Sequence, residues 1–306
     1  MALAAVKYFG NNLEQMNCTQ QFLELLYHND HNSYAFLNMK TANKMKQKAC
    51  LDKCNLIPSD THTDTWVSLN LYASGKSRTA ANVREINGFY FDLDKHDGTS
   101  AQIKRAILKT YNKILELVNK KVLPAPTAIT NTGRGLGLYY IFSRSLAVTE
   151  NTEKQRKLYS YLYSKIADIL QYYMQDKNLL EVDRVVVNDL ARIVRLPGTY
   201  NTAAKTYCTL PYIGTDYFGN VHFYELSDFK GYIKKYESEC IMPTVKKEAV
   251  KMQLISLTGC TSTFLYNRLQ QITKLQTYFN SACTNNRREY MCFVYYNTAK
   301  QIYANA

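Results

Sequence analysis

The segment 86–93, Ile-Asn-Gly-Phe-Tyr-Phe-Asp-Leu, constrains the fold of this chain more than any other segment. It is almost continuously apolar and aromatic, which is typical of a strand that is buried on both faces in the middle of a sheet. Asp92 and Asp94 lie at its end, two residues apart, so a strand would place both carboxylates on the same face. We therefore expect a central strand that carries two acidic side chains at its carboxyl end.

The periodicity of the remaining chain predicts helices and strands in a mixed order. The expected strands are 34–38, 65–72, 127–131 and 137–142, followed by a late hairpin at 207–213 and 220–224. The expected helices are 19–28, 103–118 after a capping turn at 97–100, and 151–173, with a short helix inside 182–200. This order predicts an α+β fold over most of the chain.

The character of the chain changes near residue 240. Residues 237–247 are expected to form a linker, and the strand pattern is absent beyond it. Residues 243–306 hold eight Lys or Arg against two Glu, a net charge of +6, so about half of the total net charge of +13 lies there. We expect an α+β domain at 1–236 and a small basic helical domain at 248–306.

The overall charge favours some partners and disfavours others. Lys plus Arg number 38 against 25 acidic residues, which favours a polyanionic partner, although a solvated basic surface would give the same balance.

No run of 18 apolar residues occurs, so neither a membrane span nor a membrane partner is expected. Eight cysteines at irregular spacing do not match a secreted disulfide scaffold, and we expect a cytoplasmic protein with reduced thiols.

Two short motifs hold residue types that suit phosphate and metal chemistry. Asp92 and Asp94 on one face repel each other unless a cation lies between them, and Mg²⁺ prefers such oxygen ligands. A polar strand end that enters a turn is the alternative. Residues 131–135, Asn-Thr-Gly-Arg-Gly, lie between two strands, where glycines let the main chain approach a phosphate and Arg134 offers a two-pronged donor. An ordinary glycine hairpin is the alternative here.

The third motif is the segment 183–201. It holds two Asp and three Arg within 13 residues, interleaved with apolar residues. Asp189, Arg192 and Arg195 have helical spacing, so an exposed ladder of salt bridges is the alternative. That alternative does not explain the abrupt exit Arg-Leu-Pro-Gly-Thr at 195–199.

The order and spacing of these motifs resemble the archaeo-eukaryotic primase superfamily, in the style of the primase-polymerase domains of replication proteins on bacterial plasmids and other mobile elements. In that family an Asp-x-Asp/Glu ends a central strand, a Ser-Gly-Arg-Gly-x-His-like strand pair follows, and an Asp precedes Arg-Leu-Pro-Gly-Ser/Thr. The resemblance covers roughly residues 30–235. It implies an α+β catalytic core, an RRM-like mixed or antiparallel sheet with flanking helices, followed by a small helical domain.

The resemblance also implies a role for each matching residue. Asp92, Asp94 and Asp183 would be catalytic ligands of two Mg²⁺ or Mn²⁺ ions, with Asp189 and Arg192 supporting them. The implied nucleotide-binding residues are Thr132, Gly133, Arg134, Gly135, Arg195 and Asn201. The residues expected to contact nucleic acid are Lys76, Arg78, Arg84, Arg268, Arg287 and Arg288, for which a solvated surface is the alternative. One departure is Gly137, where the family often carries a histidine that helps bind the triphosphate.

The chain is thus similar to a DNA primase or primase-polymerase, a nucleotidyltransferase that makes primers on single-stranded DNA from nucleoside triphosphates. Template, primer, NTP or dNTP, and a separate replicative helicase are the implied partners, and the sequence has no Walker phosphate loop. The main alternative is a replication-initiator DNA-binding protein with a decayed, non-catalytic primase-like fold, which Gly137 and the basic C-terminal region favour. A nuclease using the same carboxylates is a third, but no His-hydrophobe-His motif accompanies them.

Overall fold

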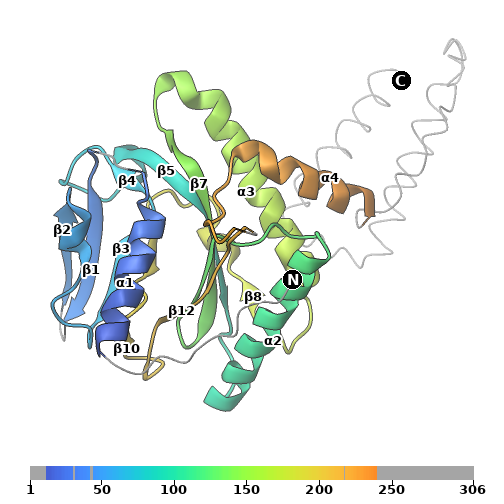
Figure 1. Ribbon diagram of the computed structural model, residues 1–306, viewed down its shortest axis with the longest axis horizontal. Coiled ribbons are helices and arrows are strands. Elements are labelled where there is room, and N and C mark those ends of the chain that lie inside the picture. Colours follow the sequence, from blue (N-terminus) through green and yellow to red (C-terminus); the bar gives the residue numbers. More distant parts are fainter. Residues whose placement is uncertain (1–11, 30–31, 42–43, 217, 240–306) are drawn as a thin grey trace, which may run out of the picture. The chain divides into compact units, whose positions relative to one another are not determined.

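The computed structural model describes residues 12–29, 32–41, 44–216 and 218–239. Within them the chain has a mixed α+β fold, with two main antiparallel sheets and helices packed against them (Figure 1). The predicted helical domain at 248–306, with Arg268, Arg287 and Arg288, lies outside the described residues. No helix in the described ranges is both long and apolar enough to cross a membrane.

The larger sheet is built around the strand that the sequence places at its centre. Its order is β12-β6-β7-β5-β4, with β8 also paired to β5. The strands are β4 (Leu71–Tyr72), β5 (Val83–Asp94), β6 (Ala128–Asn131), β7 (Gly135–Ala147), β8 (Glu181–Val182) and β12 (Thr209–Ile213). β5 and β7 are its longest strands, and they pair over most of their length.

The short strands β4 and β8 pair with opposite ends of β5. Between these ends, two tyrosine hydroxyls of the helix α3 (Glu153–Tyr173) reach the main chain of β5. The Tyr163 hydroxyl donates to the carbonyl of Tyr90 and accepts from its amide, and the Tyr159 hydroxyl donates to the carbonyl of Gly88. Main-chain groups of a buried strand need partners, and side chains supply them where no neighbouring strand does.

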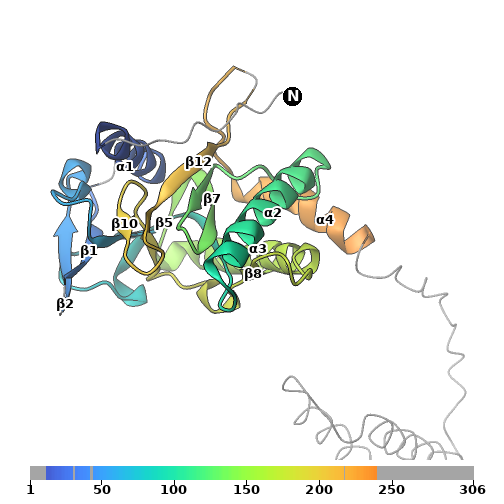
Figure 2. The same ribbon diagram turned by 90° about the horizontal axis from the view of Figure 1, so that it is seen from below.

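One face of the larger sheet packs against helices. These are α2 (Ser100–Asn119), α3 and α4 (Phe229–Glu239), which lie together on one side of the sheet in Figure 2. Phe89 is at the centre of this core and is fully buried. It contacts the rings of Phe91, Phe142, Tyr159, Tyr163 and Phe229. This aromatic packing holds β5 in place along its whole apolar stretch.

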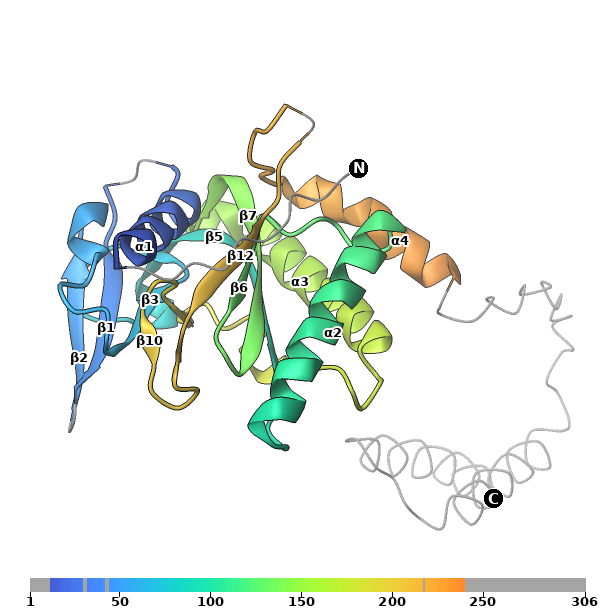
Figure 3. The same ribbon diagram turned by 60° about the horizontal axis from the view of Figure 1, so that its bottom comes forward.

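The other face joins a second core, which α1 (Asn12–Leu26) shares with the smaller sheet. That sheet has the order β2-β1-β3-β9 and is fully antiparallel. Its strands are β1 (Ala35–Thr41), β2 (Lys44–Cys50), β3 (Asp64–Ser68) and β9 (Ile193–Arg195). A separate hairpin, β10 (Tyr200–Asn201) with β11 (Thr206–Tyr207), follows it in the chain (Figure 3).

Most predicted elements are present, with three differences. The expected strand 65–72 is divided into β3 and β4, because the amide of Leu69 donates to the carbonyl of Arg192 and the side chain of Asn70 to that of Leu190. The predicted strand 220–224 is wrong, since only isolated bridges occur there. β2, α4 and the short strands β8, β9 and β10 were not predicted. In β2 only the last residue is buried, so its sequence has no apolar alternation to detect.

Candidate functional site

The fold brings three acidic residues together from distant parts of the chain. Asp92 and Asp94 lie at the end of β5, where β8 pairs with Leu93 and Asp94. Asp183 directly follows β8, and its amide donates to the carbonyl of Asp92 at 2.8 Å. Asp183 also begins the short 3-10 helix η4 (Arg184–Val186), because its Oδ1 accepts from the amide of Val185 at 2.9 Å.

Arg192 lies against this acidic group. Its Nη2 is 3.0 Å from Oδ2 of Asp92, whose side chain is 25% exposed. Burial raises the pKa of the Asp92 carboxyl above its ordinary value; the Arg192 guanidinium opposes the rise, and the charges of Asp94 and Asp183 add to it. The Nε of Arg192 is buried and has no hydrogen-bond partner. Asp92 thus lies between the charges of two neighbouring carboxylates and one guanidinium.

The donor set suits a hard divalent cation. One carboxylate oxygen of each aspartate already accepts a hydrogen bond. The donor is Arg192 for Asp92, the amide of Lys95 for Asp94 and the amide of Val185 for Asp183. The other oxygen of each has no hydrogen-bond partner in the described part of the chain, and carboxylate oxygens are the ligands that Mg²⁺ and Mn²⁺ take. No three acidic, His or Cys side chains of the described residues converge as a group that could hold a metal ion. The three carboxylates would therefore have to turn toward one point to bind one.

The turn between β6 and β7 faces the same end of the sheet, because Asp94 pairs with Gly135. Gly133 has φ +84°, and a Cβ there would collide with Thr206 and Ala204, so only glycine fits. Asn131 Oδ1 accepts from the amide of Gly133, and Thr132 Oγ1 from the amides of Arg134 and Gly135. These main-chain amides already donate to side chains of the turn, so they are not free to bind a phosphate as the sequence predicts. In this turn the guanidinium of Arg134 is the donor that could still bind one.

Asn201 joins this turn from the β10–β11 hairpin. Its Nδ2 donates to the carbonyl of Thr132 at 2.7 Å, and its Oδ1 accepts from the amides of Ala203 and Ala204. Asn201 is almost fully buried. The structure thus brings Asn201 to the predicted motif but uses both ends of its side chain to hold the turn.

Arg195 is held by a residue that the sequence reading missed. Its Nη1 is 2.6 Å from Oδ1 of Asp64, a carboxylate with a side chain 6% exposed, which also accepts from the amide and the hydroxyl of Thr202. The guanidinium carbon lies 4.6 Å from the ring centre of Trp66. Asp64 ends the polar run Asp-Thr-His-Thr-Asp at 60–64, and nothing in that run distinguishes a buried carboxylate from a surface one.

The remaining basic candidates are spread over the fold. Arg78 donates to the carbonyl of Ala191, next to Arg192, and so supports the segment that positions it. Asp189 has the same kind of role, because its Oδ1 accepts from the amide of Ala191 at 3.0 Å. Lys76 is exposed in the loop before β5. Arg84 is exposed near the start of β5, far along the strand from Asp94, so the structure does not bring it to the site.

Gly137 lies directly opposite Asp92 in the β5–β7 pairing. A Cβ at this position would lie 2.7 Å from Oγ1 of Thr130, 2.8 Å from the ring of Tyr90 and 3.2 Å from the ring of Tyr139. Tyr90 and Tyr139 are buried, with ring centres 4.9 Å apart. Two tyrosine rings therefore fill the space that a histidine at residue 137 would need, which the sequence reading did not detect.

Comparisons with known proteins give structural likenesses only. No protein-family model matches the chain, and no curated protein matches it. Among solved structures it is similar to the primase domain of the cyanophage S-2L primase-polymerase, with a TM-score of 0.46 and 12% identity over 71% of this chain and 97% of that one. It is also similar to the catalytic domain of primase RepB′ in complex with initiator DNA, with a TM-score of 0.38 and 8% identity over 78% of this chain and 98% of that one. A third similar structure is that of primase RepB′, with a TM-score of 0.36 and 12% identity over 87% of this chain and 76% of that one. Two of these three structures are of the primase RepB′, and one is of a primase-polymerase.

Proposed function

We propose that this chain is a metal-dependent nucleotidyltransferase of the archaeo-eukaryotic primase type, a DNA primase or primase-polymerase of a mobile element. The observation that carries the proposal is the gathering of Asp92, Asp94 and Asp183 at one end of β5, beside Arg192. Carboxylates from two separate segments at the end of a buried strand form an oxygen-donor set of the kind that binds the cations of phosphoryl transfer.

Each residue of the site has a task in this reaction. Asp92, Asp94 and Asp183 would hold Mg²⁺ or Mn²⁺, which supplies charge stabilisation for the attacking and leaving oxygens. Arg134 has no ion pair among the described residues and would bind the triphosphate of an NTP or dNTP. Arg195 gives one terminal nitrogen to Asp64 and keeps the other for a phosphate. Thr132, Gly133, Gly135 and Asn201 would fix the turn that presents Arg134.

The wider setting follows from the charge of the chain. A basic helical domain at 248–306, with Arg268, Arg287 and Arg288, would bind single-stranded template, and Lys76 of the catalytic domain at 1–236 would add a contact. Primers made in the cytoplasm would then be used for DNA replication, with a separate helicase opening the duplex.

The test is primer synthesis on single-stranded DNA with labelled ribonucleotides and deoxyribonucleotides, in Mg²⁺ and in Mn²⁺. The wild type should make labelled product, and Asp92→Asn should lower the rate by at least about 100-fold, the scale of losing one electrostatic group at a reacting centre. Glu181→Gln is the matched control, because Glu181 is exposed and pairs with Asp94 only through the main chain. Product from Asp92→Asn at the wild-type rate would contradict the proposal.

A second candidate is a replication-initiator DNA-binding protein whose primase-like site no longer works. It is favoured by Gly137, whose surroundings exclude a histidine, and by the side chains of the three carboxylates, which do not converge. Calorimetry with a nucleoside triphosphate and Mn²⁺ separates the two candidates. A working site binds nucleotide more tightly when Mn²⁺ is present, whereas a decayed site shows no such coupling.

A further inference from the structure

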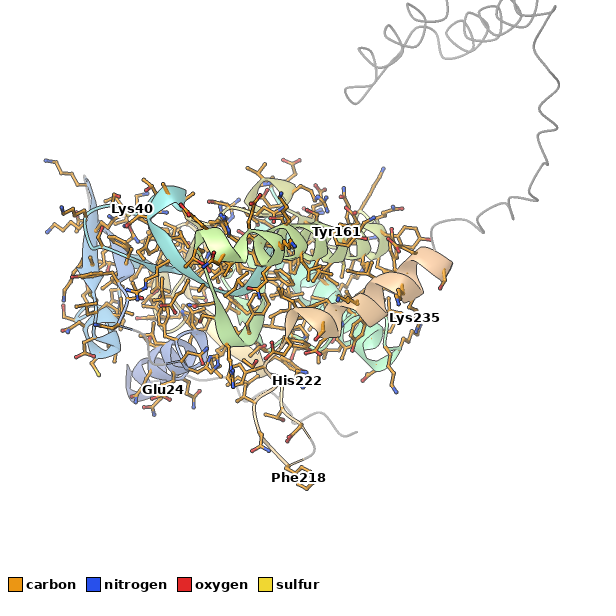
Figure 4. All side chains as sticks on the ribbon, turned by 90° about the horizontal axis from the view of Figure 1, so that it is seen from above. Glu24, Lys40, Tyr161, Phe218, His222 and Lys235 are labelled. Atoms are coloured by element: carbon orange, nitrogen blue, oxygen red, sulfur yellow. The ribbon has the colours of Figure 1, made fainter. Side chains whose placement is uncertain are left out.

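The chain crosses from the larger sheet to the smaller one between β8 and β9. β8 pairs with β5, whereas β9 pairs with β3. Figure 4 shows the two sides that this stretch joins: Lys40 of β1 marks the smaller sheet, and Lys235 of α4 marks the helices on the larger one. The last part of the stretch, residues 189–192, forms neither a helix nor a strand. We call residues 189–192 the crossing segment.

Three consecutive carbonyl groups of the crossing segment accept hydrogen bonds from one short stretch that lies earlier in the chain. The donors and acceptors are Asn70 Nδ2 to the carbonyl of Leu190 at 3.0 Å, the Arg78 guanidinium to that of Ala191, and the amide of Leu69 to that of Arg192 at 2.9 Å. A loop is mobile unless contacts of this kind hold it. These bonds therefore fix the main chain at the point where the side chain of Arg192 leaves it.

Asn70 is the centre of this support. Its side chain is fully buried and bonded at both ends, because Nδ2 donates to the crossing segment and Oδ1 accepts from the main-chain amide of Asn87 in β5 at 3.0 Å. Asn87 is bonded at both ends as well. Its Nδ2 donates to the carbonyl of Leu69 at 3.0 Å, and its Oδ1 accepts from the hydroxyl of Ser145 in β7 at 2.9 Å. A buried polar network whose members are all paired holds its neighbours in one arrangement.

A β-bulge in β5 supplies the group that holds Asn70. The pairing of β5 with β7 is regular from Gly88 onward but shifts between Ile86 and Gly88, so Asn87 has no partner in β7. A bulge of this kind frees main-chain groups from the ladder, and here the amide of Asn87 bonds to Asn70. One strand thus carries the support of the crossing segment and, toward its end, Asp92.

The side chain that the crossing segment presents is that of Arg192. Its contact with Asp92 joins one guanidinium nitrogen, Nη2, to one carboxylate oxygen, which sets the direction of the guanidinium less firmly than a two-pronged pair would. The Nε of Arg192 is buried and has no partner among the described residues. The place of the guanidinium therefore depends on where the main chain of the crossing segment lies.

An alternative is that Asn70 only closes the break between β3 and β4. Buried main-chain groups at such a break need partners, and partners within the sheet would meet that need. The bonds instead lead from the bulge in β5 to three neighbouring carbonyls that end at Arg192. A strand break by itself does not require that path.

We propose that Asn70 is a positioning residue of the acidic site, which holds the crossing segment so that Arg192 meets Asp92. The inference rests on the proposed function for its purpose, because the aim of the Asp92 carboxylate matters only if Asp92 takes part in the reaction. The placement of Arg192 itself is measurable without metal, nucleotide or activity.

The first test follows the Arg192 guanidinium by NMR in the full chain, without metal or nucleotide. Its Nε–H signal is assigned by its loss in Arg192→Lys, and its exchange with water is measured. Asn70→Ala should speed this exchange about tenfold, since two buried groups lose their partner and the crossing segment opens more often. Asn38→Ala is the matched control and should leave the signal unchanged. Asn38 is a buried asparagine of β1 whose Nδ2 has no partner among the described residues.

The second test is kinetic and uses primer synthesis at saturating Mn²⁺. Asn70→Ala should lower kcat about tenfold, within the loss of about 100-fold that a misplaced group can cause. The KM for the nucleotide should change less than about twofold, because Arg192 contacts Asp92 and this change removes no group that binds substrate. In an Arg192→Gln background, Asn70→Ala should cause no further loss, since residues that act through one contact are not additive.

Three results would overturn the inference: an Arg192 signal that is unchanged in Asn70→Ala, a wild-type kcat in that variant, or losses in kcat that multiply in the double variant. Circular dichroism shows whether each variant is folded. If Asn70→Ala does not fold, Asn70→Ser takes its place under the same criteria, because its hydroxyl keeps a polar group at this site.

The two tests also separate this inference from the proposed function. If the wild type makes no primer while Asn70→Ala still alters the Arg192 signal, the catalytic proposal fails and the positioning of Arg192 by Asn70 is supported. If primer is made and the Arg192 signal is the same in Asn70→Ala and the wild type, the inference fails and the catalytic proposal remains.

Discussion

The larger sheet is buried on both faces around β5, whereas the smaller sheet leaves its edge strand β2 exposed. Around β5, Phe89 packs among five other aromatic rings on the helix side. The strand residues 88–91 are apolar, and Asp92 and Asp94 follow them at the end of the strand. In the smaller sheet the polar and cationic side chains stand on the strands themselves, as the line of paired residues from Gln47 of β2 to Arg195 of β9 shows.

This difference separates two kinds of task. A close-packed core fixes its neighbours within small tolerances, so the end of β5 is a rigid place from which to direct carboxylates. The exposed edge strand β2 offers surface area and lysine side chains instead. The two regions meet at Arg192, which immediately precedes β9 of the smaller sheet and pairs with Asp92 of the larger one.

The largest expected effect is in the core of the larger sheet. Phe89→Ala should lower the free energy of unfolding by about 4 kcal/mol, because it removes a fully buried ring from among five others. Urea unfolding followed by circular dichroism measures the change. If the variant does not fold, Phe89→Leu should show a smaller loss in the same direction. A loss below about 1 kcal/mol would contradict the close packing of the core around β5.

The next effect concerns the one buried ion pair of the smaller sheet between described residues. Asp64→Ala should cost about 3 kcal/mol, since it leaves the Arg195 guanidinium, only 15% exposed, without its carboxylate. Burial works to raise the pKa of Asp64, but the hydrogen bonds from Thr202 and Arg195 outweigh it and hold the pKa below its ordinary value.

The pH dependence of this pair follows from the sign of that shift. A lowered folded-state pKa gives stability that is present above about pH 4 and is lost as the pH falls through the folded-state value. The gap in unfolding free energy between wild type and Asp64→Ala should therefore narrow in acid. Asp97→Ala, at an exposed position, is the control and should show no such narrowing. A gap that stays constant down to pH 2 would argue against the ion pair as its cause.

A smaller effect is expected where the two regions meet. Arg192→Gln removes the cation that opposes the burial of Asp92, so the pKa of the Asp92 carboxyl should rise further above its ordinary value. Carbon-detected NMR titration of the aspartate carboxyls measures it in metal-free buffer. Arg184→Gln is the matched control, because that guanidinium pairs with Asp168 instead, at 2.8 Å. An unchanged Asp92 pKa in Arg192→Gln would show that the pair does not form in solution.

The smallest effect is expected at Met45, on the edge strand of the smaller sheet. Met45 is 52% exposed on the edge strand β2, and surface substitutions of this kind usually change the free energy of unfolding by no more than about 0.5 kcal/mol. Met45→Ala, followed by the same urea unfolding as Phe89→Ala, checks the contrast directly. A loss comparable to that of Phe89→Ala would mean that a partner or another part of the chain covers this strand.

The sequence predicts elements whose burial follows a simple period. β5, β7, α2 and α3 were found from apolar runs and helical spacing, because each buries one or both faces against the same core. β2 has no apolar period, since six of its seven residues are not buried. The strand expected at 65–72 was divided because Leu69 and Asn70 bond to the 190–192 segment, a contact between residues about 120 positions apart.

The sequence by itself determined which acids end the central strand, the glycine turn at 131–135 and the excess of positive charge, because these depend on residue type and local spacing. Only the tertiary structure decided which charges neutralise each other, namely Arg195 with Asp64 and Arg192 with Asp92. The physical reason is that Coulomb attraction and steric fit act over a few ångströms in space, a distance that spacing along the chain does not specify for residues 100 or more positions apart.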